Sequence, residues 1–501
     1  MVTLLKRFIN WKYYVVFILI FSSIAIIFTN QVVLRDFPNS ADEYAYYISA
    51  ELFSEGMLSV ESPENPDFFH FFHIINDGKY YGKYPPGWPF FLMFGVLIGI
   101  PMIVNLIFGI LTIFLVYLIG RQFFSENVGR IAILLMAVSS FFIFNSASYF
   151  SHSSALFFLT LFCYIYLKNL ISNRKLNWFF LGIILGISFN IRQLDTLAIA
   201  VCFFVHYIYI IIRNKKPLRG EIKNAAIFLL GFILLVGIFL LYNYLQTGNP
   251  FLMPFQKYDP YDKIGLKDST WESIWSTFKE KIYKRSLNLN IWVPFCFVFM
   301  FAALFFNNKN KKEYAYLLIS VFGSLLLVHF FYWGFGGNQY GPRYLYSASF
   351  AIFLLIAVGL EAIGNRFEKT FKWTLIILIL LNLVFFINIS NLFHGKVNDR
   401  MQIYDQVREE YISNAIVFLD PPYNQWCSGS MPALDLTRNG IHFNNPVLYV
   451  HNLEEKNSIL VGEYPGRTAY IWNCQGINFQ YIKFLDFWKT ENINCSLTRI
   501  K

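Results

Sequence analysis

Long apolar runs, separated by short polar gaps, form the dominant pattern of this 501-residue chain. The runs are about 20 residues long, the length of a helix that crosses the hydrocarbon core of a bilayer. Because they are continuous rather than alternating, they predict helices and exclude a membrane β-barrel. We predict about eleven spans, at roughly 13–30, 100–120, 130–147, 153–169, 177–191, 196–212, 224–245, 290–307, 314–332, 346–363 and 372–390.

Composition and charge support this interpretation and add an orientation. Only 14% of the residues are charged and 56% are hydrophobic, whereas about a quarter of a soluble domain is charged. The net charge of +10 comes mostly from basic residues in the short gaps, so it indicates orientation rather than binding to nucleic acid. Placing those gaps inside puts the N-terminus in the cytoplasm and the C-terminus outside. The first run lacks a small-residue cleavage site and is expected to stay as an anchor.

Four segments then face outwards: a long loop at 31–100, a loop at 246–290, "WGFGGNQYGPRY" at 333–344, and a tail from 391. The tail predicts a small α/β unit, with helices at 399–412 and 454–460 and strands at 415–420, 445–452 and 466–473. We therefore expect a membrane module at 1–390 and an extracytoplasmic α/β domain at 391–501. No Walker motif or GxGxxG after a strand indicates nucleotide binding.

The six cysteines fall into two groups. Cys163, Cys202 and Cys296 lie in apolar runs and are expected to be packing residues. The other three lie in the tail, where one disulfide is possible with its pairing open; they are Cys427, Cys474 and Cys495. No CxxC or His-rich cluster predicts a metal site, and no cofactor is required, although a divalent ion between an acid and a phosphate stays open.

An acidic pair opens the long loop, in "FPNSADEYAYYISAELF" at 37–53. Ser40 and Glu43 have the spacing of a capping box, and Asp42 suits the positive end of a helix dipole. Spacing alone favours this structural role. The same position, at the boundary of membrane and water, also suits Asp42 as a general base for a substrate held in lipid. The two roles are compatible, because Glu43 can cap while Asp42 reacts.

Several motifs together resemble the GT-C superfamily of membrane glycosyltransferases, in particular its bacterial group of protein O-mannosyltransferases and aminoarabinose transferases. After the acidic pair come "DGKYYGKYPPGWPFFLMF", "NSASYFSHSSALFFLTLF", "YNYLQTGNPF" and "GNQYGPRYLYSASFAIF", in the order of that group. The resemblance implies an inverting transfer of a sugar from a polyprenyl-phosphate carrier to an acceptor outside the cytoplasmic membrane. It implies that Asp42 is the base and Glu43 an auxiliary acid. Family members carry another acid near the fourth span, where this chain has His152 between two serines.

A departing phosphate needs cations in a place of low dielectric constant. Arg343 and Arg192 lie at the outer ends of predicted spans, where ionisable residues are rare. The full set of candidates for the donor phosphate is Arg343, Arg192, Lys83 and Lys79, with His152 and Tyr340 as possible additions. The alternatives are a local ion pair of Arg192 with Asp195, and contacts with lipid headgroups for Arg343 and the lysines.

Three other classes of protein are alternatives to the transferase. A transporter or flippase of lipid-linked saccharides needs polar residues at mid-membrane depth, whereas the polar groups here lie mostly at the outer ends. A polymerase or ligase usually centres on a large late loop. A membrane-anchored binding protein would use the tail alone. The expected partners are the lipid-linked donor, the outer acceptor and the bilayer, in a bacterial cytoplasmic membrane.

Overall fold

The computed structural model describes residues 12–172, 174–261, 263–265, 270–305, 309–332, 339–419, 439–475, 478–482, 485, 487–491 and 494–500. In this part of the chain, eight helices are long and apolar enough to cross a membrane, so the chain is a multi-pass membrane protein. They are α2 with η1 (Tyr14–Val33), α5 with η3 (Ile103–Phe124), α8 (His152–Ser172), α10 (Gln193–Arg213), α11 (Leu218–Thr247), α16 (Lys309–Phe330), η6 with α17 (Arg343–Gly364) and α18 (Glu368–Glu409).

Two further spans are broken helices, which brings the number to as many as ten. In the first, α6 (Glu126–Val138) and α7 (Ser140–Ala147) meet at 63°. In the second, the arm Trp271–Trp292 (α13, η4 and α14) meets Cys296–Phe305 (α15 and η5) at 93°. The predicted span at 290–307 is therefore only the second arm of a bent pair, and its first arm lies in the predicted loop at 246–290. The turn is made at Phe295, which has a left-handed φ of 58°.

The remaining predicted spans each coincide with a helix of the bundle. Two apolar helices are shorter than the others, α4 (Gly87–Leu97) and α9 (Lys175–Ile191). The number of spans, predicted as eleven, therefore stays a prediction, while the mostly helical membrane fold is confirmed. The most enclosed span is η6 with α17, whose first residue is Arg343, so the bundle itself fixes the position of that arginine.

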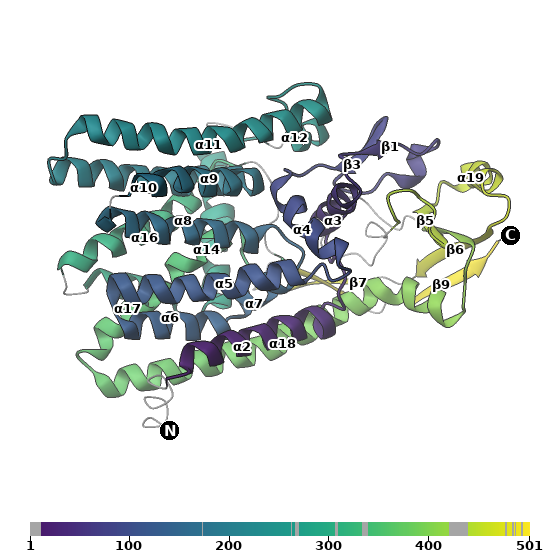
Figure 1. Cartoon of the computed structure of the whole chain (residues 1–501). Helices are drawn as coiled ribbons and strands as arrows, with labels where there is room; N and C mark the ends of the chain where they lie inside the picture. The colour runs from purple at the N-terminus through teal and green to yellow at the C-terminus, as the bar shows by residue number, and fades with distance from the viewer. Residues whose placement is uncertain are drawn as a thin grey trace.

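The long loop after α2 forms a compact layer at one end of the bundle (Figure 1). It contains α3 (Ala41–Ser54) and a small antiparallel sheet of β1 (Val60–Glu61), β3 (Lys79–Gly82) and β2 (Ile74–Asn76). A side chain at Gly82 would collide with the backbone carbonyl of Ala45 in α3. Glycine at this position therefore lets β3 lie directly on α3, and this brings the next residues, Lys83 and Tyr84, towards the start of α3.

The tail is joined to the bundle by α18, which extends without a break from Glu368 to Glu409 (Figure 1). The predicted division at 390/391 falls inside this helix, and the first strand of the tail begins at Ala415. A four-stranded sheet of order β5-β4-β6-β9 follows, from strands β4 (Ala415–Leu419), β5 (Val447–His451), β6 (Thr468–Gln475) and β9 (Asn494–Arg499). The two other described strands, β7 (Asn478–Ile482) and β8 (Phe487–Glu491), pair with each other.

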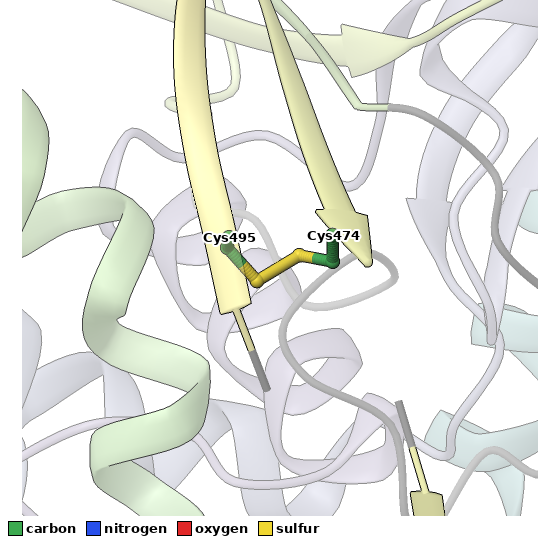
Figure 2. Close-up of a disulfide and its surroundings, with 2 residues drawn as sticks. All are labelled: Cys474 and Cys495. Carbon is green, nitrogen blue, oxygen red and sulfur yellow. A yellow bond between two sulfur atoms is a disulfide. The ribbon is translucent and has the colours of Figure 1, made fainter. Parts of the chain in front are cut away.

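The strands and the short helix predicted for the tail are found where they were expected, with α19 at Asn457–Glu463. One disulfide links neighbouring strands, between Cys474 of β6 and Cys495 of β9 (Figure 2). The third tail cysteine, Cys427, lies outside the described residues. The cysteines of the apolar runs are unpaired.

The tail sheet packs on the loop layer rather than standing apart from it. Phe68 meets Phe418 of β4 at 6.2 Å between ring centroids, and His451 of β5 donates from Nε2 to the carbonyl oxygen of His70 (2.9 Å). The buried apolar residues of both segments belong to one hydrophobic core. The loop layer therefore has the helical bundle on one side and the tail sheet on the other, and α3 lies in its middle.

Candidate active site

Helix α3 begins at the acidic pair, and its start is capped as predicted. The backbone N–H of Glu43 donates to Ser40 Oγ (3.2 Å), and the Ser40 hydroxyl donates to Glu43 Oε2 (3.0 Å). The return bond from the backbone comes from Asn39 N–H (3.0 Å) instead of Ser40 N–H. These bonds fix the first turn of α3, and with it the direction in which Asp42 leaves the helix.

The carboxylate of Glu43 is completely buried and satisfied by backbone donors. Its Oε1 accepts from Tyr149 N–H (2.9 Å), which ties the start of α3 to the turn before α8. Burial raises the pKa of Glu43 to about 7, although the bonds from Tyr149, Ser40 and Asn39 oppose that rise. Glu43 therefore anchors α3 on the bundle, which fits an auxiliary role rather than direct contact with reactants.

The carboxylate of Asp42 points instead into a group of polar residues from distant parts of the chain. Arg343 Nη2 lies 2.8 Å from Asp42 Oδ2. The Tyr84 hydroxyl donates to Oδ1, and His73 Nε2 lies 3.5 Å from the same oxygen. Burial alone would raise the pKa of Asp42, but the charge of Arg343, aided by His73, Tyr84 and Lys83, outweighs burial and holds that pKa well below its ordinary value.

Arg343 reaches Asp42 because of the turn that precedes it. Gly341 has a φ of +92°, a conformation that favours glycine, and Arg343 N–H donates to its carbonyl oxygen (2.7 Å). The guanidinium then lies 4.3 Å from the centroid of the Phe150 ring. Asp42 and Arg343, which are separated by most of the chain, therefore meet at one place.

Arg192 makes the local ion pair that was the alternative to a phosphate contact. Its Nε lies 2.6 Å from Asp195 Oδ2. The buried Asp195 also accepts from Ser347 Oγ (2.6 Å), and its Oδ1 lies 2.9 Å from His329 Nε2. The other end of the guanidinium is within 3.1 Å of His152 Nε2. Arg192 is therefore held in place from both ends and keeps His152 beside it.

A third arginine, Arg285, joins this group although sequence analysis did not select it. Its guanidinium lies 4.8 Å from the ring centroid of Tyr344, and Arg192 and Arg343 lie 6.0 and 5.9 Å from the same ring. Arg285 is buried, its Nη1 has no hydrogen-bond partner, and no ion pair among the described residues includes it. Arg285 therefore has no carboxylate at ion-pair distance in the part of the chain that the structure describes.

The remaining candidates separate into one that joins the site and two that do not. Lys83 is buried, with Nζ 4.6 Å from the Tyr258 ring centroid, and its charge acts on Asp42. Lys79 donates to the carbonyl oxygen of Leu245 at the end of α11, and no described contact links it to Asp42. Tyr340 packs its ring against Phe393 at 4.8 Å. The structure thus brings Lys83 into the cluster and leaves Lys79 outside it, whereas Tyr340 lies at its edge, with its ring 5.8 Å from the Phe150 ring that carries Arg343.

The residues that sequence analysis missed carried weak signals. Arg285 stands in "KRSLNLNIW", just before an apolar run, so the reasoning that selected Arg343 would have found it with a different estimate of the span. Tyr84 belongs to a quoted motif, but nothing marked its hydroxyl. His73 sits in an aromatic stretch, and its left-handed φ of 65° is visible only in the structure. Among the described residues, no group of three or more His, Cys, Asp and Glu side chains could hold a metal ion.

Comparison with known structures identifies the fold. ArnT from Cupriavidus metallidurans, bound to undecaprenyl phosphate, aligns over 92% of this chain and 96% of its own, with a TM-score of 0.55 and 10% identity. Its apo form aligns over 91% and 92%, with a TM-score of 0.56 and 12% identity. The chain therefore has the GT-C fold, and the resemblance found in the sequence is confirmed at the level of the fold.

The sequence itself supplies a second match. Residues 85–242 match the model of the dolichyl-phosphate-mannose-protein mannosyltransferase family. This segment runs from the approach to α4 to the last turns of α11, and it includes His152, Arg192 and Asp195. No curated protein matches the chain significantly.

Proposed function

We propose that this protein is an inverting glycosyltransferase that moves a sugar from a polyprenyl-phosphate carrier to an acceptor outside the cytoplasmic membrane. The observation that carries the proposal is the contact of Asp42 with Arg343, inside a buried group of cations. A carboxylate and a guanidinium at one point supply the two things that this reaction needs. They are a proton acceptor for the attacking hydroxyl and a positive charge for the departing phosphate.

The balance of charge supports an anionic ligand. The cations of the cluster are Arg192, Arg285, Arg343 and Lys83. Asp42 pairs with Arg343 and Asp195 pairs with Arg192, whereas Arg285 has no carboxylate at ion-pair distance among the described residues. Burying uncompensated charge is unfavourable, and a phosphate monoester or diester would supply the missing negative charge. The guanidinium groups also suit the geometry of phosphate oxygens.

The fold of the structural neighbour agrees with that choice of ligand. The ArnT structure was solved with undecaprenyl phosphate, which is a polyprenyl phosphate. The name of the family whose model matches residues 85–242 refers to a dolichyl-phosphate sugar donor. The chemistry of the cluster in this chain and the ligand of a protein with the same fold therefore both favour a polyprenyl phosphate as the ligand. The sugar that the carrier brings is not specified by either.

The reaction can be written with the residues of the cluster. The acceptor oxygen attacks the anomeric carbon, and the bond from that carbon to the phosphate oxygen breaks with its electron pair on the phosphate. The proton of the acceptor hydroxyl goes to Asp42. Attack from the side opposite the phosphate inverts the anomeric configuration. Arg285, Arg343 and Lys83 hold the phosphate, which leaves without needing a proton.

Because of Arg343, the proton affinity of Asp42 depends on whether a donor is bound. While it is paired with Asp42, the carboxylate has a low pKa and is a weak base. A donor phosphate that draws the guanidinium towards itself raises the proton affinity of Asp42. Asp42 would then become an effective base only when a donor is bound.

The disulfide supports the orientation of the site. Disulfides form and persist in oxidising compartments outside the cytoplasm, and Cys474–Cys495 lies in the sheet that packs on the loop layer. That layer carries Asp42. We infer that the tail and the active site face outwards and that the N-terminus is cytoplasmic. The acceptor is then a glycolipid, an envelope glycan or a protein.

The test is an assay of purified protein with a panel of undecaprenyl-phosphate sugars and an extract of envelope acceptors, in which release of undecaprenyl phosphate is measured. We expect Asp42→Asn to lower the rate by about 100- to 10,000-fold. Asp405→Asn, at a carboxylate paired with Arg35 outside the cluster, should leave the rate nearly unchanged. Full activity of Asp42→Asn would remove Asp42 from the role of base. Movement of intact donor across vesicles without release would favour a flippase instead.

A further inference from the structure

One buried group in the site is not used by the reaction described above. His152 is the first residue of α8, and it is 1% exposed. Its ring lies edge-on to the Phe150 ring, with 5.2 Å between the centroids, and Phe150 also carries the Arg343 guanidinium. The charges of Arg192, Arg343 and Asp42 all act on the imidazole. His152 therefore lies beside Arg192 and next to the Phe150 ring that carries Arg343, one of the residues proposed to hold the phosphate.

The contact with Arg192 determines where the imidazole carries its proton. Arg192 Nη1 is 3.1 Å from His152 Nε2. A guanidinium is always protonated and can only donate, so Nε2 has to be the acceptor of this bond. An acceptor nitrogen carries no proton, and the neutral ring then has its proton on Nδ1. His152 is thus a neutral histidine with an N–H donor at Nδ1.

This donor has no partner in the described part of the chain. Nδ1 of His152 is buried and makes no hydrogen bond among the described residues. Buried donors nearly always make a hydrogen bond, and a buried donor without one destabilises the folded state. Tyr346, the other ring at His152, lies at 6.3 Å between centroids and uses its hydroxyl towards Ser146 and the carbonyl oxygen of Phe142. The Nδ1–H group is therefore available to an oxygen from outside the described part of the chain.

We propose that His152 is a ligand-binding residue whose Nδ1–H donates to a phosphoryl oxygen of the lipid-linked phosphate. The inference rests on the proposed function and makes it more specific. A phosphoryl oxygen fits because the cations near His152, Arg192 and Arg343, attract an anion to this place. A neutral donor beside them adds direction without adding charge. Asp195 has a separate part, since it holds Arg192 against Nε2 and so keeps the proton on Nδ1.

Two substitutions separate the two nitrogens of the ring. In His152→Asn the amide nitrogen occupies the position of Nδ1, which keeps the donor and loses the acceptor for Arg192. In His152→Gln the amide reaches the position of Nε2, where its oxygen can accept from Arg192, and the donor at Nδ1 is lost. A purely structural role predicts that the Gln variant is the better tolerated. A ligand-binding role predicts that the Asn variant binds better.

The experiment measures binding of undecaprenyl phosphate to purified full-length protein, from the rise in thermal unfolding midpoint with ligand concentration. We expect His152→Gln to lower the affinity by about 10- to 100-fold, and His152→Asn by about threefold or less. Equal affinities, or weaker binding by the Asn variant, would overturn the inference. If the wild-type protein itself fails to bind undecaprenyl phosphate, the proposed function fails, and this outcome is distinct from an unchanged Gln variant.

A second measurement observes the histidine in the wild-type protein, and variants are needed only to assign its signal. In wild-type protein labelled with ¹⁵N-histidine, His152 is one of eight histidines and can be assigned by the signal that is lost in His152→Phe or in either variant above. The free protein should show a protonated Nδ1 and an unprotonated Nε2. Addition of undecaprenyl phosphate should shift the Nδ1 proton downfield, as expected for a new bond to a phosphate oxygen. A proton on Nε2, or no shift with bound ligand, would contradict the assignment.

Discussion

Arg343 and Asp42 form an ion pair with 2.8 Å between Nη2 and Oδ2, although one starts the span that leads into α17 and the other starts α3. The pair joins the centre of the bundle to the loop layer, and it sets the proton affinity of the carboxylate. The position of each residue of the pair is set locally. The Ser40 cap orients Asp42, and the turn at Gly341 orients Arg343.

Replacing Arg343 should change the pH dependence of the reaction as well as its rate. The pKa of Asp42 is held below its ordinary value mainly by Arg343, against the effect of burial. In Arg343→Gln that pKa should rise, so the ionised base should be lost at a higher pH as the solution is acidified. We expect the acidic limb of the kcat/KM profile to move upwards in pH, together with a rate loss of about 100-fold or more. Arg408→Gln, at an exposed pair with Asp405, should leave the profile in place.

Glu43 predicts a pH dependence of stability. Its pKa is raised from 4.5 to about 7 in the folded protein because the group is buried. The folded state therefore holds a proton that the unfolded chain releases, and the stability is largest below about pH 4.5 and falls as pH rises through 7. The loss corresponds to about 3 kcal/mol. Thermal unfolding between pH 5 and 8 should show this decline in wild-type protein and lack it in Glu43→Gln. A decline of equal size in both would assign it to another group.

The Asp195 network should matter more for stability than for chemistry. Asp195→Asn would leave Arg192 as a buried cation without its carboxylate, which costs about 3–5 kcal/mol. Ser347→Ala removes one hydrogen bond to the same carboxylate and should cost about 1 kcal/mol. Unfolding midpoints of the purified variants test this order. A larger loss for Ser347→Ala than for Asp195→Asn would show that Asp195 is not the partner that stabilises Arg192.

Arg285 and Lys79 offer a matched comparison of two cations. Arg285 is buried at Tyr344 and has no carboxylate partner among the described residues, whereas Lys79 is exposed and bonded to a helix end. We expect Arg285→Gln to weaken the binding of undecaprenyl phosphate by about 10- to 100-fold, and Lys79→Gln to leave it unchanged. Ligand-dependent shifts of the unfolding midpoint provide the measurement. Equal losses would mean that general charge, and not the cluster, attracts the lipid.

Apolar length located most helices of the bundle, but it predicted neither the arm Trp271–Trp292 nor the extent of α18. The apolar run ends near 390, and we predicted a separate helix from 399. The structure continues the same helix to Glu409. Its buried residues after the run, Phe393, Val397, Arg400, Ile403 and Val407, keep the helical period of three to four. The change in composition near 390 therefore does not mark the end of the helix. The spacing of the apolar residues after it was the better guide to how far the helix extends.

In the site, sequence reasoning could identify residues by type and position but not by partner. Asp42 was found because the acidic pair resembles that of a known family, and Arg343 because an arginine at a span edge is unusual. Lys79 and Lys83 looked alike in one motif, and only the close packing of β3 on α3 at Gly82 sends Lys83 inwards. The free nitrogen of His152 depends on which donor meets the other side of its ring, which no local pattern records.

The unbroken course of α18 has a mechanical consequence. A helix of this length behaves as a stiff rod of about 60 Å, so the tail sheet cannot swing on a tether while the bundle stays still. Any tilt of the sheet would therefore tilt the apolar half of the same helix. A large molecule that binds to the sheet and moves it would change the packing of α18 against the other membrane spans.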